Sequence, residues 1–133
     1  MQVIVCVDDD LGMMFNHRRV SRDRKLIDRI LEITKGKRIL MNHYSEELFA
    51  EKQDIFVEDD FLEKAGEQDV CFVENEPLAP YTDQIDKIIL YRWNRKYPAD
   101  VHFDIPLKEW HLTESYDFEG YSHEKITEEV YER

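Results

Sequence analysis

The apolar positions of this chain form short runs separated by polar turns, and these runs predict a sheet of buried strands. Residues 2–7, QVIVCV, are an unbroken and largely β-branched run, which is typical of a strand covered on both faces. Similar runs predict further strands at 38–41, 54–57, 70–74, 87–93 and 100–104. The pattern therefore favours a central sheet of about eight strands once the C-terminal strands are added.

Helical spacing is clearest after the first strand. Apolar residues recur with the helix period through residues 22–34, with Ser21 as a suitable N-cap and Gly36 as the stop. A second helix is expected from Ser45 to Lys52, and about one helical turn at 61–65. Residues 13–20 carry turn and loop chemistry and predict an exposed loop.

The C-terminal third follows a different period. Residues 110–118 and 125–131 alternate apolar and polar positions, as antiparallel strands with one solvated face do. Strands and helices alternate first and consecutive strands follow. This order predicts one α/β domain over residues 1–133, with a central mixed sheet, an antiparallel C-terminal hairpin, and helices on both faces as a three-layer sandwich.

Composition supports a folded chain without a membrane segment. Apolar residues make up 42% of the 133 residues and aromatic residues 12%, so the chain can bury a core. No apolar run approaches the roughly 20 residues of a membrane helix, and the N-terminus lacks the pattern of a secretory signal. Cys6 and Cys71 lie within apolar runs and are expected to be inert core thiols. We expect a cytoplasmic protein.

Charge is unevenly distributed along the chain. The net charge is −12, yet residues 16–38 hold nine basic side chains against three acidic ones. An isolated basic segment can attract an anionic ligand, while the acidic remainder repels nucleic acid and anionic membranes. The sequence therefore points to residues 16–38 as the place where an anion would bind.

The layout resembles dihydrofolate reductase over almost the whole chain. VIVCVDDDLGM resembles the first strand of that family and its glycine-containing loop, and SRDRKLIDRI resembles its first helix. RILMNHYSEELF resembles the second strand and helix, CFVENEPLAPYTDQIDKIILYRW the segment that closes the cofactor site, and the tail from VHFDIP to EKITEEVYER the closing hairpin. The resemblance implies the dihydrofolate reductase fold and places Asp23 near the family's acidic substrate-binding residue.

Three departures from the resemblance concern the cofactor. Glu74 and Asn75 stand where the family has two glycines that let the backbone approach the pyrophosphate. A carboxylate there would also repel a phosphate by about 4 kcal/mol at 4 Å in an effective dielectric near 20. Asn42 and His43 replace the family's Gly-Arg motif, and residues 54–70 are too few for the elements that hold the adenosine half. We therefore expect no NADPH and no other cofactor.

Candidate ligand-binding residues follow the first and second strands. A phosphate-bearing small molecule or an RNA end is one interpretation of the loop and helix start, because ligands gather at the carboxyl ends of strands and arginines favour anions. The other interpretation is a solvated loop whose arginines pair with the acidic remainder. The ligand-binding candidates are Asn16, Arg18, Arg19, Arg22, Asn42, His43 and Tyr44.

Catalytic and nucleic-acid candidates carry weaker signals. Asp23 could relay a proton if burial raised its pKa, or it could be an ordinary acid of the first helical turn. His17 is the second catalytic candidate. Arg92, Trp93 and Arg95 mix rings with cations as a nucleic-acid stacking platform does, but they could instead be core and turn.

Other enzyme chemistry finds little support in the residues. Asp8, Asp9 and Asp10 fit a solvated turn better than a cation site, and we expect no bound metal. His102, His111 and His123 lack ligand spacing and are interpreted as structural. No GxSxG, Walker, GxGxxG or HExxH motif is present.

The sequence leaves three hypotheses for function. The leading one is a non-reductase binding or regulatory module on a dihydrofolate reductase-like scaffold, which holds a phosphorylated ligand through residues 16–22. The alternative is an enzyme, either a divergent reductase or a nucleotide or RNA hydrolase that uses Asp23 and His17. The third is an interaction unit that works through an exposed edge strand or as a homodimer.

Overall fold

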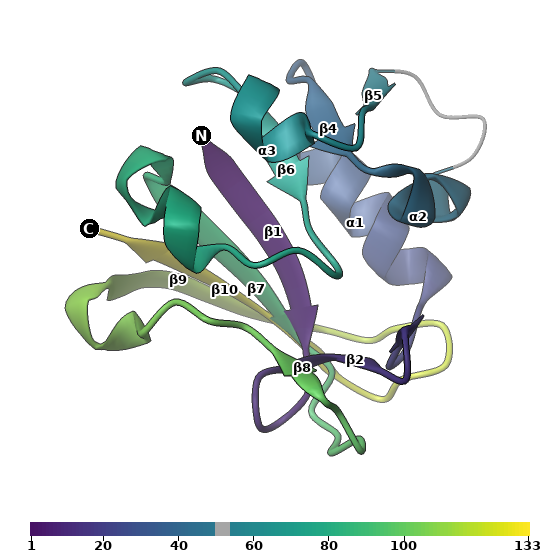
Figure 1. The fold of residues 1–133 in the computed structure, drawn as a ribbon. Helices are drawn as coiled ribbons and strands as arrows, with labels where there is room; N and C mark the ends of the chain where they lie inside the picture. Colours follow the sequence, from purple (N-terminus) through teal and green to yellow (C-terminus); the bar gives the residue numbers. More distant parts are fainter. Residues whose placement is uncertain (50–53) are drawn as a thin grey trace.

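A mixed seven-stranded sheet organises the computed structural model, which describes residues 1–49 and 54–133. The strand order is β5-β4-β6-β1-β7-β10-β9, and the first five strands are parallel. The last two strands run antiparallel, which confirms the predicted parallel centre with an antiparallel C-terminal hairpin (Figure 1). The bounds are β1 Gln2–Val7, β4 Ile39–Met41, β5 Ile55–Val57, β6 Val70–Phe72, β7 Lys87–Arg92, β9 His111–Phe118 and β10 Ile126–Glu132.

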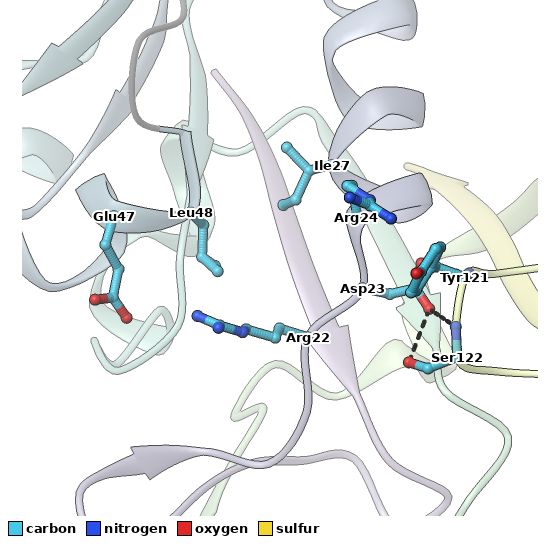
Figure 2. Close-up of a pocket in the computed structure, with 8 residues that line it drawn as sticks. All are labelled: Arg22, Asp23, Arg24, Ile27, Glu47, Leu48, Tyr121 and Ser122. Atoms are coloured by element: carbon cyan, nitrogen blue, oxygen red, sulfur yellow. Dashed lines mark hydrogen bonds between the residues drawn. The ribbon is translucent and has the colours of Figure 1, made fainter.

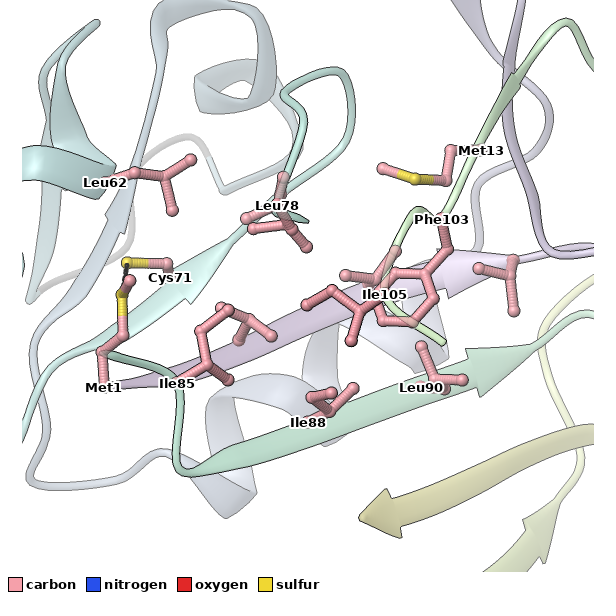
Figure 3. Close-up of a cluster of buried hydrophobic side chains, with 14 of the residues drawn as sticks. Met1, Met13, Leu62, Cys71, Leu78, Ile85, Ile88, Leu90, Phe103 and Ile105 are labelled. Atoms are coloured by element: carbon pink, nitrogen blue, oxygen red, sulfur yellow. Dashed lines mark hydrogen bonds between the residues drawn. The ribbon is translucent and has the colours of Figure 1, made fainter. Parts of the chain in front are cut away.

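Helices cover both faces of this sheet, as predicted. The longest is α1 Arg24–Ile33, followed by α2 His43–Glu46 and α3 Phe61–Lys64, with short 3₁₀ segments η1 Glu47–Phe49, η2 Ala79–Gln84 and η3 Leu107–Glu109. Side chains of α1 and η1 join one buried cluster with Ile4, Phe72 and Trp93. The opposite cluster contains Met1, Val5 and Leu90 with side chains of α3 (Figure 3).

A second, small sheet corrects two expectations. Its order is β3-β2-β8, from β2 Gly12–Phe15, β3 Arg18–Arg19 and β8 Val101–His102. Residues 13–20 are therefore a hairpin rather than a loop, because Asn16 and His17 both have positive φ and form a two-residue turn of the kind that joins twisted strands. The strand expected at 100–104 pairs with this hairpin, so the central sheet has seven strands and not about eight.

The start of α1 differs from the prediction. The cap is Asp23 rather than Ser21, since the Asp23 carboxylate accepts a hydrogen bond from the backbone N–H of Lys25. The second helix begins at His43, before Ser45, because Asn42 accepts from the N–H of Ser45 and caps it. The predicted end of that helix, at 50–52, lies outside the described residues.

The two C-terminal strands differ in how they meet solvent. β10 alternates buried and half-buried positions, as the period-two pattern predicted. β9 is exposed at almost every position, so the expectation of one covered face was wrong for this strand. The reason is that β9 is the last strand of the sheet, paired on one side only.

Two further features concern the apolar content of the helices and the state of the cysteines. None of the helices within residues 1–49 and 54–133 has the length and apolar content needed to cross a membrane. Cys6 and Cys71 are both free thiols. Burial raises the pKa of the Cys71 thiol to about 12, so this side chain stays protonated and unreactive at neutral pH.

Candidate functional site

The candidate site lies where the parallel strands end. The segments that follow β1, β4 and β6 meet at the same edge of the sheet, because parallel strands present their carboxyl ends together. Ligands of open α/β sheets gather at this edge. Here the edge is formed by Asn42 to Glu47 after β4, by Glu74 and Asn75 after β6, and by Arg19 from the hairpin.

A buried ion pair between Arg19 and Glu74 occupies the centre of this edge. Glu74 is 8% exposed, and the Arg19 guanidinium donates to both of its carboxylate oxygens at 2.8 and 3.1 Å. Ser45 donates its hydroxyl to the same carboxylate at 2.7 Å, and Arg19 also bonds Glu47. Desolvation lowers the pKa of Arg19, but the hydrogen bonds and charges of Glu74 and Glu47 outweigh it and raise the pKa above its ordinary value. Arg19 is thus paired with two of the protein's own carboxylates.

Asn42, His43 and Tyr44 are also engaged within the protein. Asn42 is buried, caps α2 and donates to the side chain of Asn75 at 2.8 Å. The Tyr44 hydroxyl accepts from the Arg19 backbone N–H, and its ring lies 4.5 Å from the Arg19 guanidinium. His43 is exposed and pairs with Asp59, which raises the pKa of the imidazole. Tyr44 thus supports Arg19, while Asn42 joins the start of α2 to the bend after β6.

Exposed arginines line an open groove beside the ion pair. One hollow of about 410 Å³ is lined by Arg22, Arg24 and Tyr121 over the apolar side chains of Ile27 and Leu48 (Figure 2). A second hollow of about 400 Å³ shares Arg22 and Glu47 with it and adds Arg18, Arg19, Ser21 and Tyr44. We refer to both together as the arginine groove.

The cations of the arginine groove are available to a ligand. In the part of the chain that the structure describes, Arg18, Arg22 and Arg24 pair with no carboxylate. Arg24 lies 4.1 Å from the centre of the Tyr121 ring, which is 64% exposed. The groove therefore offers guanidinium donors next to an open aromatic surface.

Asp23 lies in the wall of the first hollow, and its carboxylate points toward the loop after β9 (Figure 2). The Asp23 side chain is fully buried, and its carboxylate accepts from the backbone N–H of Tyr121 at 2.8 Å and of Ser122 at 2.9 Å. It also bonds Nδ1 of His123 at 2.8 Å. Burial raises the pKa of this carboxyl, but these donors and the N–H of Lys25 outweigh burial and hold the pKa well below its usual range. Asp23 is therefore ionised at neutral pH and is not a carboxylic acid poised to relay a proton.

His17, the second catalytic candidate, makes no contact with Asp23 among the hydrogen bonds of the described residues. His17 and Asn16 form the exposed tip of the β2–β3 hairpin, where both have positive φ. The Asn16 N–H donates to Asp100 at 3.1 Å, which ties the tip to β8. The histidine that contacts Asp23 is His123, which sequence reasoning interpreted as structural.

The expected stacking platform is not formed on the surface. Trp93 is 2% exposed and stacks on His123, with ring centres 4.6 Å apart. Its ring therefore cannot receive a base from solution, which corrects its assignment. Arg92 pairs with Glu129 across the sheet, and of the three residues only Arg95 is exposed.

The comparison with solved structures decides the fold. A dihydrofolate reductase from Enterococcus faecalis, complexed with NADP(H) and RAB-propyl, superposes with a TM-score of 0.70, covering 99% of this chain and 95% of that chain. The chain has the dihydrofolate reductase fold. The identity is 11%, no protein-family model matches, and no curated protein sequence matches. The likeness therefore shows the fold alone.

In this divergent dihydrofolate reductase-like chain, the bend after β6 carries two side chains that are bonded within the protein, where two glycines would leave the backbone bare. Asn75 is held by the side chain of Asn42, and Glu74 is held by Arg19 and Ser45. The sequence pointed to Glu74 and Asn75. The residues that bond Glu74, Ser45 and Arg19, are 29 and 55 residues away from it along the chain. No local pattern reveals such contacts, and for that reason Glu47, Tyr121 and His123 were missed.

Proposed function

We propose that this chain is a non-reductase binding module that holds a small phosphate-bearing ligand in the arginine groove. The observation that carries the proposal is the pair of exposed guanidinium groups, Arg22 and Arg24, above an apolar floor in a hollow of about 410 Å³. Hollows of this size suit ligands as large as a nucleotide. Guanidinium groups bind phosphate through paired, charge-assisted hydrogen bonds.

The residues after β6 do not fit the dinucleotide that the Enterococcus enzyme binds. A pyrophosphate needs backbone without side chains at that bend, so that its oxygens can reach the N–H groups. Glu74 fills the bend with a buried carboxylate whose charge is balanced by Arg19. Dinucleotide binding would have to break this ion pair, and removing one partner of a buried pair costs about 3–5 kcal/mol. The geometry therefore supports a binding function over a reductase.

Calorimetric titration with inorganic pyrophosphate and adenosine monophosphate tests the proposal. We expect saturable binding that weakens as salt is raised, because exposed charges are screened. Replacing Arg22 by alanine removes a charge-assisted contact of about 1.5–3 kcal/mol, so affinity should fall roughly tenfold to a hundredfold.

The matched control is Lys108→Ala, which removes the same charge from the exposed surface at η3. Affinity should be unchanged in this variant. Equal weakening of binding in both variants would show that the anions respond only to the net charge of the protein, which would contradict the proposal. The absence of any saturable binding to the unaltered protein would also contradict it.

A further inference from the structure

Two side chains close in the sequence, Ser21 and Asp23, form a continuous hydrogen-bonded chain with the distant His123 beside the arginine groove. The hydroxyl of Ser21 lies 2.9 Å from Nε2 of His123, and Nδ1 of His123 lies 2.8 Å from the Asp23 carboxylate. Ser21 and His123 are separated by 102 residues. This is the connectivity of a serine nucleophile, a general base and an orienting carboxylate.

The carboxylate fixes the proton on the histidine. Asp23 is ionised and can only accept, so Nδ1 of His123 carries the hydrogen of that bond. In the neutral imidazole Nε2 is then an acceptor, and the Ser21 hydroxyl donates to it. The tautomer is therefore the one in which His123 can take a proton from Ser21.

The surroundings hold the histidine in this orientation. His123 is 5% exposed, and Trp93 stacks on its ring. Asp23 is held in turn by the backbone N–H groups of Tyr121 and Ser122. Gly120 leaves the space for this arrangement, since a Cβ there would lie 2.7 Å from the Asp23 carboxylate.

The nucleophile is accessible and the following residue is suited to stabilise an oxyanion. Ser21 is half-buried and lines the hollow of about 400 Å³ together with Arg18 and Arg22. The backbone N–H of Arg22 donates to no residue within 1–49 and 54–133. The N–H after a nucleophilic serine is a common oxyanion donor in hydrolases.

We propose that Ser21, His123 and Asp23 form an acyl-transfer site that hydrolyses carboxylic esters with an anionic acyl group. The choice of an anionic substrate rests on the proposed function of the arginine groove, because Arg18 and Arg22 share the hollow with Ser21. The serine, histidine and carboxylate have the roles of nucleophile, base and orienting group.

The reaction proceeds in two balanced steps. Ser21 Oγ forms a bond to the ester carbonyl carbon while its proton moves to His123 Nε2, and the oxyanion faces the Arg22 N–H. The bond to the alkoxy oxygen then breaks, and the leaving alcohol takes the proton from His123. Water repeats the sequence on the acyl-serine, so that the carboxylic acid leaves and Ser21 regains its hydrogen.

Labelling with an uncharged fluorophosphonate tests the triad without depending on anion binding. We expect one label per chain, located at Ser21 by peptide mapping. His123→Gln should slow labelling by at least about a hundredfold, since loss of a general base costs 10²–10⁴ in rate. Circular dichroism would verify that the variant is folded.

Ser115→Ala is the matched control, because Ser115 is an exposed serine on β9 outside the triad. Its labelling should equal that of the unaltered chain. Absence of label at Ser21 in the unaltered chain would overturn the triad. An unchanged labelling rate in folded His123→Gln would overturn it as well.

The substrate class has a separate readout. We expect the para-nitrophenyl ester of glutaric acid to be hydrolysed at least about tenfold faster than the uncharged valerate ester of equal chain length. Equal rates would overturn the anionic substrate while leaving the label on Ser21 in place. Failure of pyrophosphate and adenosine monophosphate to bind, with Ser21 still labelled, would contradict the proposed function and not the triad.

Discussion

At the residue scale, two carboxylates are fixed by backbone donors. Asp8 accepts from the N–H groups of Gly12, Asp10 and Tyr97, and Asp23 accepts from three backbone N–H groups and His123. For both, burial raises the pKa and these donors outweigh it, so the pKa of each carboxyl lies below its ordinary value. Asp8 therefore joins the end of β1 to the segment after β7, and Asp23 joins the start of α1 to the loop after β9.

Asp23 should make the free energy of unfolding depend on pH. Its folded pKa is lowered, so its stabilisation is complete above the unfolded pKa of about 3.9 and is lost as pH falls toward the folded pKa. We expect the free energy of unfolding in urea to fall between pH 5 and pH 2. In Asp23→Asn this fall should be smaller and the stability at pH 7 lower. An equal pH dependence in both proteins would contradict the role given to Asp23.

Gly12 should not tolerate a side chain. A Cβ at this position would lie 2.3 Å from the Cβ of Ala99 and 2.8 Å from the Asp8 carboxylate. Crowding of this kind costs about 1–3 kcal/mol, so Gly12→Ala should lower the urea midpoint without changing the slope. Gly66→Ala is the control, because its Cβ would only reach ordinary contact with Asp69 at 3.5 Å. Equal effects would contradict the packing around Gly12.

At the scale of elements, a partly buried ion pair joins α1 to the C-terminal hairpin. Arg29 on α1 donates to both oxygens of Glu128 on β10, at 2.9 and 3.0 Å, and Tyr91 of β7 donates to the same carboxylate. The helix also covers apolar side chains of the sheet. The polar contact fixes where along the sheet the helix lies.

Arg29→Met should destabilise the fold strongly. It leaves Glu128 buried without its cation, which costs about 3–5 kcal/mol in the free energy of unfolding. Lys25→Met on the exposed part of the same helix should change stability by less than about 0.5 kcal/mol. Urea unfolding measures both. The double variant Arg29→Met with Glu128→Leu should recover much of the loss, and an additive loss would contradict the pairing.

The elements also show how far sequence reasoning reaches. Strands β1, β4, β6 and β7 were predicted because strands covered on both faces read as continuous apolar runs. The hairpin at 13–20 was missed since β3 has only two residues, Arg18 and Arg19, and carries no apolar period. Asn16 at the turn was the available signal, because asparagine tolerates positive φ.

The site was less predictable than the fold. Glu74 and Asn75 could be singled out from the resemblance, and Arg22 from its charge. The ion pair of Arg19 with Glu74 spans 55 residues, and the contact between Asp23 and His123 spans 100. Such contacts form only when the whole sheet has assembled, and neither periodicity nor spacing in the sequence encodes them.

At the scale of the whole molecule, the carboxyl edge of a dihydrofolate reductase-like sheet is divided into two parts. Arg19 and Glu74 fill the centre with an internal ion pair, while Arg18, Arg22 and Arg24 leave a cationic groove open beside it. The rest of the chain is strongly acidic. The molecule can therefore attract an anion at this groove and repel it elsewhere.

The central ion pair should also support the whole fold. Glu74→Ala leaves the buried Arg19 guanidinium with Glu47 as its remaining carboxylate, and we expect a loss of about 3 kcal/mol in the free energy of unfolding. Glu67→Ala, an exposed glutamate in the turn before β6, should change stability by less than about 0.5 kcal/mol. Thermal and urea unfolding compare the two. A stability unchanged in Glu74→Ala would contradict the structural importance of the pair.

A crystal structure of the protein grown with NADPH tests the central claim most directly, because it locates any bound dinucleotide. We expect an intact ion pair between Arg19 and Glu74 and no pyrophosphate against Glu74 and Asn75. Density for NADPH at that bend, with its phosphates on the backbone N–H groups and the Arg19–Glu74 pair broken, would contradict this expectation.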